Sequence, residues 1–314
     1  QSVAAGEAYE VRLAEPSDRD GFLALYEDVW ERSRDESWFD WRFLDDPYAA
    51  GPEMVVAERE GSLVGAEPLV PMPLAVGSER VLARQPVDWI VHPDHQRRGV
   101  FTRMTKLLLS VYGDRTDLLF NFPTDALLPG LEKFDWTTVS TQSTRYRIHD
   151  LERVAADSAA ADSHAIGLLD RFGGPAVKAG LAAADLLTSA PMDVSVERVT
   201  GVATDAIDAV YTETRPDAVH VPREPAFVEW RFDNPRWDTA TYVARRGSRP
   251  VSTVVVATAA EQATCGYLLD VQPMTTVPER APAFAAALEA ALDDLDVDAV
   301  AASTDPYPSV LQRR

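Results

Sequence analysis

The chain has 314 residues, enough for about two domains with separate hydrophobic cores, so a single small module is excluded. Apolar residues make up 46% and charged residues 25%, which excludes wholesale disorder and a coiled coil. Acidic residues number 50 against 30 basic ones, and the resulting net charge of -20 disfavours nucleic acid as a partner.

Only three of the basic residues are lysines, and this scarcity combined with the acidic excess is typical of proteins adapted to molar salt. At such salt the Debye length falls to about 3 Å, which screens the self-repulsion of the chain. A GC-rich genome that favours arginine over lysine is the alternative, although it leaves the net charge unexplained. We therefore interpret the protein as halophilic.

No apolar run approaches the length of a membrane span, and the first residues lack the pattern of a signal peptide. We expect a cytoplasmic protein that does not associate with membranes. A single cysteine, Cys265, excludes an intrachain disulfide, and five scattered histidines offer no metal-ligand spacing. We expect no metal site.

The elements predicted in the first half alternate between strands and helices. Apolar alternation and turn residues predict strands over Tyr9–Ala14, Met54–Glu58, Ser62–Pro68, Arg84–Val91, Asp117–Phe122 and Thr138–Arg147. Helical spacing predicts helices over 20–32, after Ser17 as a favourable N-cap, and over 99–112. The Ala-rich interval 151–190 is predicted to be a helical connector.

Three blocks of the first half recur in the same order in the second half. The triplet Trp41-Arg42-Phe43 returns as Trp230-Arg231-Phe232, YEVRLAE with its following helix as VSVERVT, and NFPTDALLPGLEKF as ASTDPYPSVLQRR. Three collinear matches predict a duplication. Because both copies keep the triplet, we interpret it as a packing device with arginine paired to a carboxylate, although tryptophan and arginine also serve recognition.

The segment VDWIVHPDHQRRGVFTRM, Val87–Met104, carries the most chemical information. An apolar strand passes through a proline turn into a loop and then a helix. Residues 96–100 place successive amides at the helix N-terminus, where unsatisfied N–H groups and the helix dipole favour a pyrophosphate. Gly99 permits close approach of the backbone. The segment predicts an anion-binding site.

This segment resembles motif A of the GNAT superfamily of N-acetyltransferases, whose pattern is a strand, (Gln/Arg)-x-x-Gly-x-(Gly/Ala) and a helix. Gln96 and Gly99 match the pattern, whereas Phe101 stands where glycine or alanine is usual and narrows the space beside the phosphates. The resemblance covers roughly 9–148 and implies that the loop binds acetyl-coenzyme A. The residues it assigns to the cofactor are Ile90, Val91, Gln96, Arg97, Arg98, Gly99, Val100, Phe101 and Thr102.

The resemblance also implies the fold class, which is α/β with two tandem GNAT-like domains. Each domain is expected to have a mixed, mostly antiparallel sheet flanked by helices. We expect a catalytic domain over 1–150, the connector over 151–190, and a degenerate copy over 191–314. In that copy GYLLDVQPMTTVPERAPAF replaces the loop, and Pro278 and Pro282 remove amides, so we expect no coenzyme A binding there. This copy also lacks the last strands, so either the chain is truncated or another segment supplies them.

The reaction that the resemblance implies is direct attack of an amine on the thioester, with a backbone amide near Ile90-Val91 stabilising the oxyanion. An ammonium must first lose a proton. Asp88 is the candidate base, although it could instead be solvated or paired with arginine. His92, or His95, could relay a proton, and Asn121 ends the next strand within the expected site.

The proton donor is harder to assign from the sequence. Many relatives protonate the leaving thiolate with a tyrosine, and Leu131 occupies that position here. Tyr112 and Tyr146 are the alternatives. For the acceptor site, the candidates are Trp38, Asp40, Trp89 and Asn121.

We expect an N-acetyltransferase that uses acetyl-coenzyme A and a small-molecule or peptide amine, and a homodimer is compatible with the sequence. Phe101 and Leu131 keep open a non-catalytic sensor or scaffold that binds coenzyme A. A second rival is a tandem fold that transfers aminoacyl groups from tRNA to peptidoglycan. The intact loop and the acidic composition disfavour it.

Overall fold

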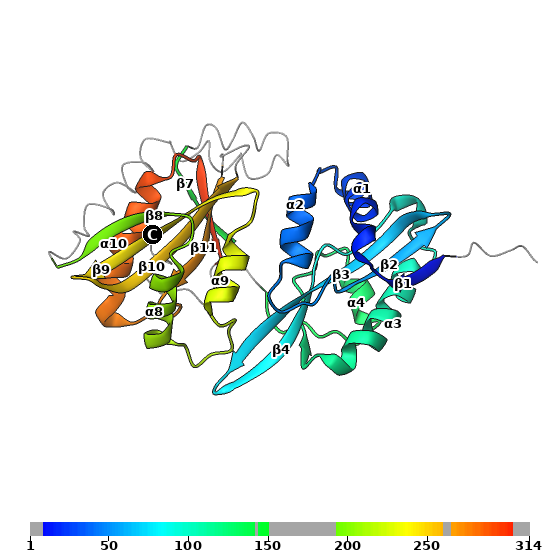
Figure 1. Cartoon of the computed structure of the whole chain (residues 1–314), viewed down its shortest axis with the longest axis horizontal. Helices are drawn as coiled ribbons and strands as arrows, with labels where there is room; N and C mark the ends of the chain where they lie inside the picture. Colours follow the sequence, from blue (N-terminus) through cyan, green and yellow to red (C-terminus); the bar gives the residue numbers. More distant parts are fainter. Residues whose placement is uncertain (1–8, 142–143, 151–192, 260–264, 304–314) are drawn as a thin grey trace, which may run out of the picture. The chain divides into compact units, whose positions relative to one another are not determined.

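The computed structural model describes residues 9–141, 144–150, 193–259 and 265–303. The chain divides into two compact units, residues 1–139 with 217–222, and residues 140–216 with 223–314. The first unit thus ends earlier than the predicted limit at residue 150, and the predicted connector 151–190 lies outside the described residues. Each unit contains one six-stranded mixed sheet (Figure 1).

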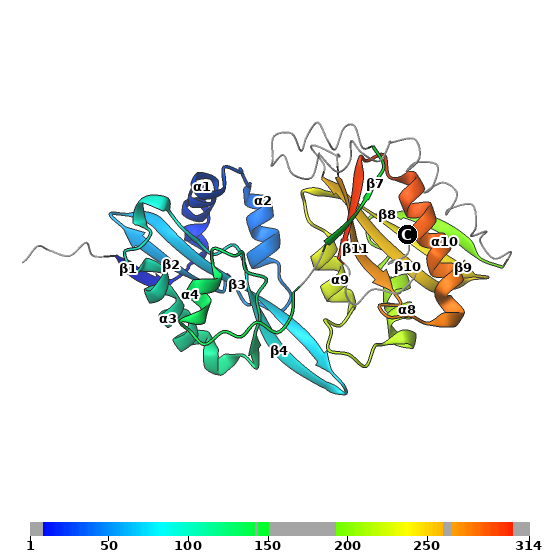
Figure 2. The same ribbon diagram turned by 180° about the vertical axis from the view of Figure 1, so that it is seen from behind.

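The sheet of the first unit has the strand order β1-β2-β3-β4-β6, and β5 pairs with β3. Its strands are β1 (Glu10–Leu13), β2 (Met54–Arg59), β3 (Ser62–Val76), β4 (Glu79–Pro86), β5 (Ile90–Val91) and β6 (Leu118–Leu119). Its helices are α1 (Arg19–Trp30), α2 (Glu36–Phe39), α3 (Val100–Tyr112) and α4 (Leu128–Glu132). α1 and α2 cover one face of the sheet, and α3 and α4 cover the other (Figures 1 and 2).

β3 extends well beyond the predicted strand because its prolines do not interrupt the ladder. Its first half pairs with β2 and its second half with β4. Pro71 and Pro73 lie in the second half. Ala75, two residues after Pro73, directs its N–H away from β4 and donates it to the His220 carbonyl at 2.8 Å. The side on which the two prolines lack an N–H therefore also faces away from β4. A proline on the open side of a strand removes no ladder hydrogen bond.

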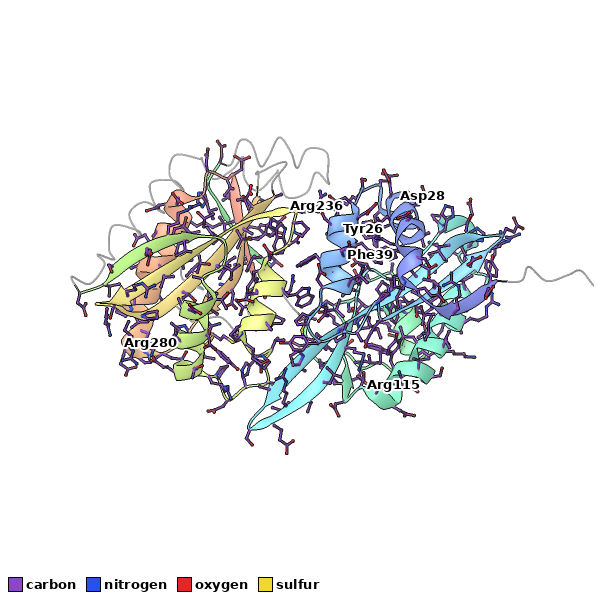
Figure 3. All side chains as sticks on the ribbon, viewed as in Figure 1. Tyr26, Asp28, Phe39, Arg115, Arg236 and Arg280 are labelled. Atoms are coloured by element: carbon purple, nitrogen blue, oxygen red, sulfur yellow. The ribbon has the colours of Figure 1, made fainter. Side chains whose placement is uncertain are left out.

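Two apolar layers hold the helices of the first unit to the sheet. On the α3 face, Val100, Met104 and Leu108 are fully or almost fully buried. On the opposite face, α1 and α2 contribute an aromatic cluster in which Phe22 packs edge-to-face on Phe39 with ring centroids 5.5 Å apart. Figure 3 labels Tyr26 and Phe39 in this cluster, on α1 and α2.

The second unit has the strand order β7-β12-β11-β10-β9-β8. Its strands are β7 (Thr144–Ile148), β8 (Ser195–Thr200), β9 (Trp237–Arg246), β10 (Arg249–Ala259), β11 (Cys265–Gln272) and β12 (Ala299–Ser303). Its described helices are α8 (Thr204–Thr214), α9 (Pro225–Phe232) and α10 (Ala281–Asp294). α10 packs on one face of this sheet, and α8 and α9 lie on the other (Figures 1 and 2).

The strand predicted over 138–147 belongs to the second sheet, which corrects its placement in the first copy. β7 pairs antiparallel with β12, from Thr144 opposite Ser303 to Ile148 opposite Ala299. β12 runs parallel to β11 on its other side, so without β7 its outer edge would expose unpaired backbone groups. A segment from before the second copy therefore supplies the strand that this copy lacks.

The repeated triplet is a packing device for its aromatic side chains, as predicted. Trp41 and Phe43 are buried in the first unit, and Trp230 and Phe232 are buried in the second. The arginine of the first triplet pairs with a carboxylate, as described below.

Candidate functional site

Beyond β4 the sheet of the first unit separates into two parts, because β5 pairs with β3 and β6 pairs with β4. A pocket of about 880 Å³ lies where these two parts separate. β6 runs parallel to β4 at Arg84, and the Phe120 N–H donates to the Arg84 carbonyl at 3.3 Å. Beyond this point the chain that follows β4 turns to pair with β3 as β5. Residues 85–91 line one side of the pocket and residues 121–124 another.

A β-bulge separates β4 from β5. Leu69 pairs with Pro86 and Ala66 with Ile90, so residues 87–89 lie opposite only two residues of β3. Asp88, in the middle of the bulge, has a φ of 49°, a left-handed conformation that aspartate tolerates better than most residues. The bulge interrupts the strand predicted over 84–91 and redirects its last two residues.

The amide of Val91 lies on the open side of β5. The His92 N–H donates to the Val64 carbonyl at 2.9 Å, so His92 holds a hydrogen-bonded position of the ladder. Adjacent residues of an antiparallel strand direct their backbone groups to opposite sides, so those of Val91 point away from β3. Its carbonyl indeed accepts a hydrogen bond from Gln96 Nε2 at 3.1 Å. Because Val91 lines the pocket, its N–H can donate to an oxygen bound there.

The loop before α3 presents backbone donors to the pocket. Gly99 is the N-cap, with a φ of 79°, and no side chain caps the first turn of this 13-residue helix. Gly99, Val100, Phe101 and Thr102 all line the pocket, and no described atom lies within 4 Å of where a Cβ of Gly99 would stand. Uncapped N–H groups at a helix N-terminus are a favourable environment for phosphate oxygens.

Three predicted cofactor residues of this loop have different surroundings. Gln96 holds the loop to β5 through its bond to Val91. Arg97 adopts a left-handed conformation, with a φ of 58°, and lines the pocket. Arg98 is exposed and is not among the residues that line the pocket.

Phe101 forms part of the pocket wall. Its ring atoms lie 3.0 and 3.1 Å from where a Cβ of Gly130 would stand, so the large ring on α3 is matched by a glycine on α4. The ring also makes edge-to-face contacts with Trp89 and Phe134, at centroid distances of 5.9 and 6.3 Å. These contacts explain how the loop accommodates phenylalanine at this position.

Asp88 lines the pocket and is paired with the arginine of the first triplet. Arg42 Nε donates to Asp88 Oδ2 at 2.8 Å, and both side chains are about one-fifth exposed. The Arg42 guanidinium also lies 5.7 Å from the Trp38 ring. The predicted alternative of an arginine-paired carboxylate is therefore the arrangement observed. Arg42 lines the pocket as well, so the triplet also reaches the site.

The histidines and Asn121 differ in their relation to the pocket. Asn121 and His95 line it, whereas His92 caps the short 3-10 helix at 93–95 by accepting the Asp94 N–H at 3.3 Å. His95 Nδ1 lies 3.0 Å from the Tyr9 hydroxyl. Partial burial and the nearby Arg59 lower the pKa of His95, which favours its neutral form.

Of the other residues predicted for the acceptor site, one lines the pocket and two do not. Trp89 lines the pocket, as Asn121 does. Trp38 is buried in the aromatic cluster, and Asp40 pairs with Arg19 at 3.2 Å, so neither borders the pocket.

A second carboxyl, which the sequence motifs did not predict, borders the pocket. Glu67 on β3 is completely buried, and its Oε1 accepts a hydrogen bond from the Thr105 hydroxyl at 2.9 Å. Its Oε2 has no hydrogen-bond partner among the described residues. Burial raises the pKa of Glu67 well above its usual range. The sequence feature that could have identified Glu67 is a single acidic residue within the apolar run GAEPLV.

No tyrosine is placed as a proton donor among the described pocket residues. Leu131 is buried, Tyr112 packs beneath the Arg84 guanidinium at 5.5 Å, and Tyr146 lies on β7 of the second unit. The two tyrosine alternatives for the acid therefore do not line this pocket.

The second unit has the same strand, turn and helix order without the donor loop. β11 leads through a 3-10 helix at 278–280 into α10, whose N-cap is Arg280 and whose first turn contains a proline. Asp270, the counterpart of Asp88, is buried and accepts a hydrogen bond from Arg223 at 2.8 Å. A buried ion pair thus occupies the position where the first unit has its pocket carboxylate.

Other kinds of site find little support in the described ranges. No described helix combines the length and apolar character needed to cross a bilayer. Among the described residues, no three His, Cys, Asp or Glu side chains gather as metal ligands. Cys265 is half-buried, and burial raises the pKa of its thiol.

The residues of the pocket fit coenzyme A. An uncapped helix N-terminus with a left-handed glycine provides amide donors for a pyrophosphate, and Arg97 adds a positive charge nearby. The divided sheet leaves an extended space between β5 and residues 121–124 for the rest of the molecule.

Comparison with known proteins identifies the same domain. The family model for an acetyltransferase (GNAT) domain matches residues 10–139. No curated protein matches the sequence significantly.

Solved structures share the fold at low sequence identity. A probable N-acyltransferase from Enterococcus faecalis V583 has 10% identity over 94% of this chain and 65% of its own, with a TM-score of 0.67. A GCN5-related N-acetyltransferase from Anabaena variabilis ATCC 29413 has 11% identity, 97% and 68% coverage, and a TM-score of 0.65. This chain therefore spans about two thirds of the length of those proteins.

A tandem GNAT protein from the clavulanic acid biosynthesis pathway is also similar. It has 12% identity over 98% of this chain and 93% of its own, with a TM-score of 0.59. The predicted α/β class with two mixed sheets and flanking helices is confirmed. Residues 10–139 form a GNAT acetyltransferase domain, in a chain that has the fold of tandem GNAT proteins.

Proposed function

We propose that the first unit is an N-acyltransferase that transfers the acetyl group of acetyl-coenzyme A to a primary amine by direct attack of the amine. One observation carries the proposal: a single pocket joins the uncapped N-terminus of α3, the outward amide of Val91 and the carboxylate of Asp88. These are a phosphate-binding element, an oxyanion donor and a group that attracts a cation.

Each part of the pocket has a distinct task. When bound, acetyl-coenzyme A supplies an activated acyl group. The amides of residues 99–102 and Arg97 hold the pyrophosphate, and Gln96 keeps the loop attached to β5. The Val91 N–H donates to the oxygen that becomes negative during transfer. Asp88, held by Arg42, attracts the ammonium of the acceptor and takes its proton, directly or through water.

Asp88→Asn is expected to slow turnover without weakening acetyl-coenzyme A binding. The amide keeps the shape of the side chain and cannot take a proton, so kcat should fall about 100-fold. The rise of kcat with pH should also change. Initial rates across pH and a calorimetric titration of the cofactor measure the two effects.

The matched control is Asp94→Asn, because Asp94 is a largely exposed carboxylate in the same loop and does not line the pocket. It should leave kcat and its pH dependence unchanged. If Asp88→Asn retains the wild-type pH profile, Asp88 is not the proton acceptor.

A panel of amines tests the proposed function. Release of coenzyme A is followed at molar KCl with polyamines, amino sugars, aminoglycosides, peptide α-amines and protein lysines as acceptors. Turnover with at least one primary amine, and an N-acetylated product by mass spectrometry, is expected. Binding of acetyl-coenzyme A without turnover on any amine would instead favour a coenzyme A sensor, the alternative that the buried Leu131 supports.

A further inference from the structure

The proposed reaction lacks an assigned proton donor for the leaving thiolate. Leu131, which stands where the GNAT resemblance implies a proton-donating tyrosine, is buried. Neither Tyr112 nor Tyr146 lines the pocket. Any donor must therefore be sought among the other titratable and charged groups that border the pocket. In the described residues these are Arg42, Glu67, Asp88, His95, Arg97 and Lys133.

Most of these groups are unsuited to give a proton at neutral pH. The arginines keep their protons at all relevant pH values. His95 has a lowered pKa and favours the neutral form. Asp88 is engaged by Arg42 and is assigned to the acceptor. Glu67 and Lys133 remain, and Lys133 is exposed on the surface.

Glu67 stands at the inner wall of the pocket, opposite the β-bulge. Ala66, its neighbour, pairs with Ile90, and Leu69 pairs with Pro86, so Glu67 faces the residues that carry Asp88 and lead to Val91. Its side chain is fixed on one side only, because Thr105 on α3 holds Oε1 while Oε2 has no described partner. A buried polar atom without a hydrogen-bond partner lowers the stability of the folded protein, so its presence at the pocket indicates a function.

The same surroundings decide which form of the carboxyl is present. Desolvation raises the pKa of Glu67 well above its usual range, and the Thr105 hydrogen bond only partly opposes this effect. A protonated carboxyl has one O–H donor. Thr105 has one hydroxyl proton and two acceptors within reach, Glu67 Oε1 at 2.9 Å and the Phe101 carbonyl at 3.0 Å. When Thr105 donates to Oε1, the proton of Glu67 is carried by Oε2.

Given the proposed function, we propose that Glu67 is the catalytic acid that protonates the leaving thiolate. The O–H bond at Oε2 breaks as an S–H bond forms on the departing sulfur. The nitrogen loses two protons in all: Asp88 takes the first from the ammonium and passes it to water, and the Glu67 carboxylate takes the second from the newly acylated nitrogen. Glu67 is thereby protonated again for the next cycle. The exchange of protons balances with no reactant besides water.

The first test compares wild type with Glu67→Gln, which keeps the size of the side chain and has no transferable proton. The active form of an acid is protonated, so wild-type kcat should fall as pH rises through the pKa of Glu67. In Glu67→Gln, kcat with acetyl-coenzyme A should fall about 100-fold and this descending limb should vanish. Lys133→Met is the control, and it should keep the descending limb.

An activated donor separates acid catalysis from a structural role. The phenolate of p-nitrophenyl acetate leaves without a proton, so Glu67→Gln should acetylate the same amine from this donor at the wild-type rate. An equal loss with both donors would overturn the proposal, and so would a variant that retains the wild-type kcat and descending limb.

Infrared spectroscopy gives a readout that does not depend on turnover. Protein labelled with ¹³C at the glutamate carboxyl should keep the carbonyl band of a protonated acid at pH values where ordinary glutamates are ionised, and Glu67→Gln should lack this band. Acetyl-coenzyme A should shift this band, whereas ADP, which carries only the pyrophosphate end, should not. Absence of the band in wild type would overturn the role of Glu67 without affecting the proposed function. A wild-type chain that neither binds acetyl-coenzyme A nor acetylates any amine would refute both.

Discussion

Gly99→Glu is expected to abolish binding of acetyl-coenzyme A. Gly99 is the N-cap of α3 with a φ of 79°, and it lines the pocket. Glutamate there would place a carboxylate against the pyrophosphate, and like charges in contact cost several kcal/mol. We expect the Kd to rise about 100-fold or more, which calorimetric titration measures.

The control must carry the same backbone strain without reaching the pocket. Gly61, in the turn between β2 and β3 of the same unit, has a φ of 82° and does not line the pocket. Gly61→Glu should therefore lower stability to a similar small extent and leave the Kd unchanged. Unchanged binding in Gly99→Glu would show that the cofactor lies elsewhere.

The largest expected loss of stability follows from Arg84→Met. Arg84 on β4 is buried, and its guanidinium donates to Glu53 Oε1 at 3.0 Å, to the Arg115 carbonyl at 2.7 Å and to the Thr116 hydroxyl. Methionine would leave the Glu53 carboxylate largely buried without its partner. Breaking one partner of a buried pair costs about 3–5 kcal/mol. We expect the Tm of the first unit to fall by roughly 10 °C.

Arg245→Met is the matched control in the second unit. Arg245 also pairs with a glutamate, Glu197 at 3.1 Å, but both side chains are substantially exposed. Such a pair contributes roughly 0–1 kcal/mol, so this variant should unfold almost as wild type does. Equal effects of the two substitutions in thermal unfolding would contradict the role given to burial.

The sequence predicted those parts of the fold that local patterns specify. Helical spacing located α3 closely, and Gly99 at its start has the left-handed conformation that a glycine permits. The strands predicted over 54–58 and 62–68 form β2 and the first half of β3, and the turn at Glu60-Gly61 joins them with both residues at positive φ. The resemblance of the loop to motif A identified the family of the first unit.

The sequence could not predict features that depend on distant partners. β7 looks like a strand of the first copy, and only the open edge of β12 decides that it joins the second sheet. The bulge at Asp88 arises from a register difference across β3, which no local pattern shows. Glu67 was missed because its importance depends on burial beneath α3 and on Thr105.

The halophilic interpretation remains a prediction. It depends on a net charge of -20 and three lysines, and neither property reports on the pocket. It does decide the conditions for experiments, because self-repulsion of so acidic a chain is screened at molar salt.

We propose that this chain binds acetyl-coenzyme A in the pocket of the first unit alone. The most direct test is a calorimetric titration of acetyl-coenzyme A into the wild-type chain at molar KCl. We predict a micromolar Kd with one site per chain, because the second unit lacks the glycine-containing loop and has a proline in the first turn of α10. No binding to folded protein, or two sites per chain, would contradict the account.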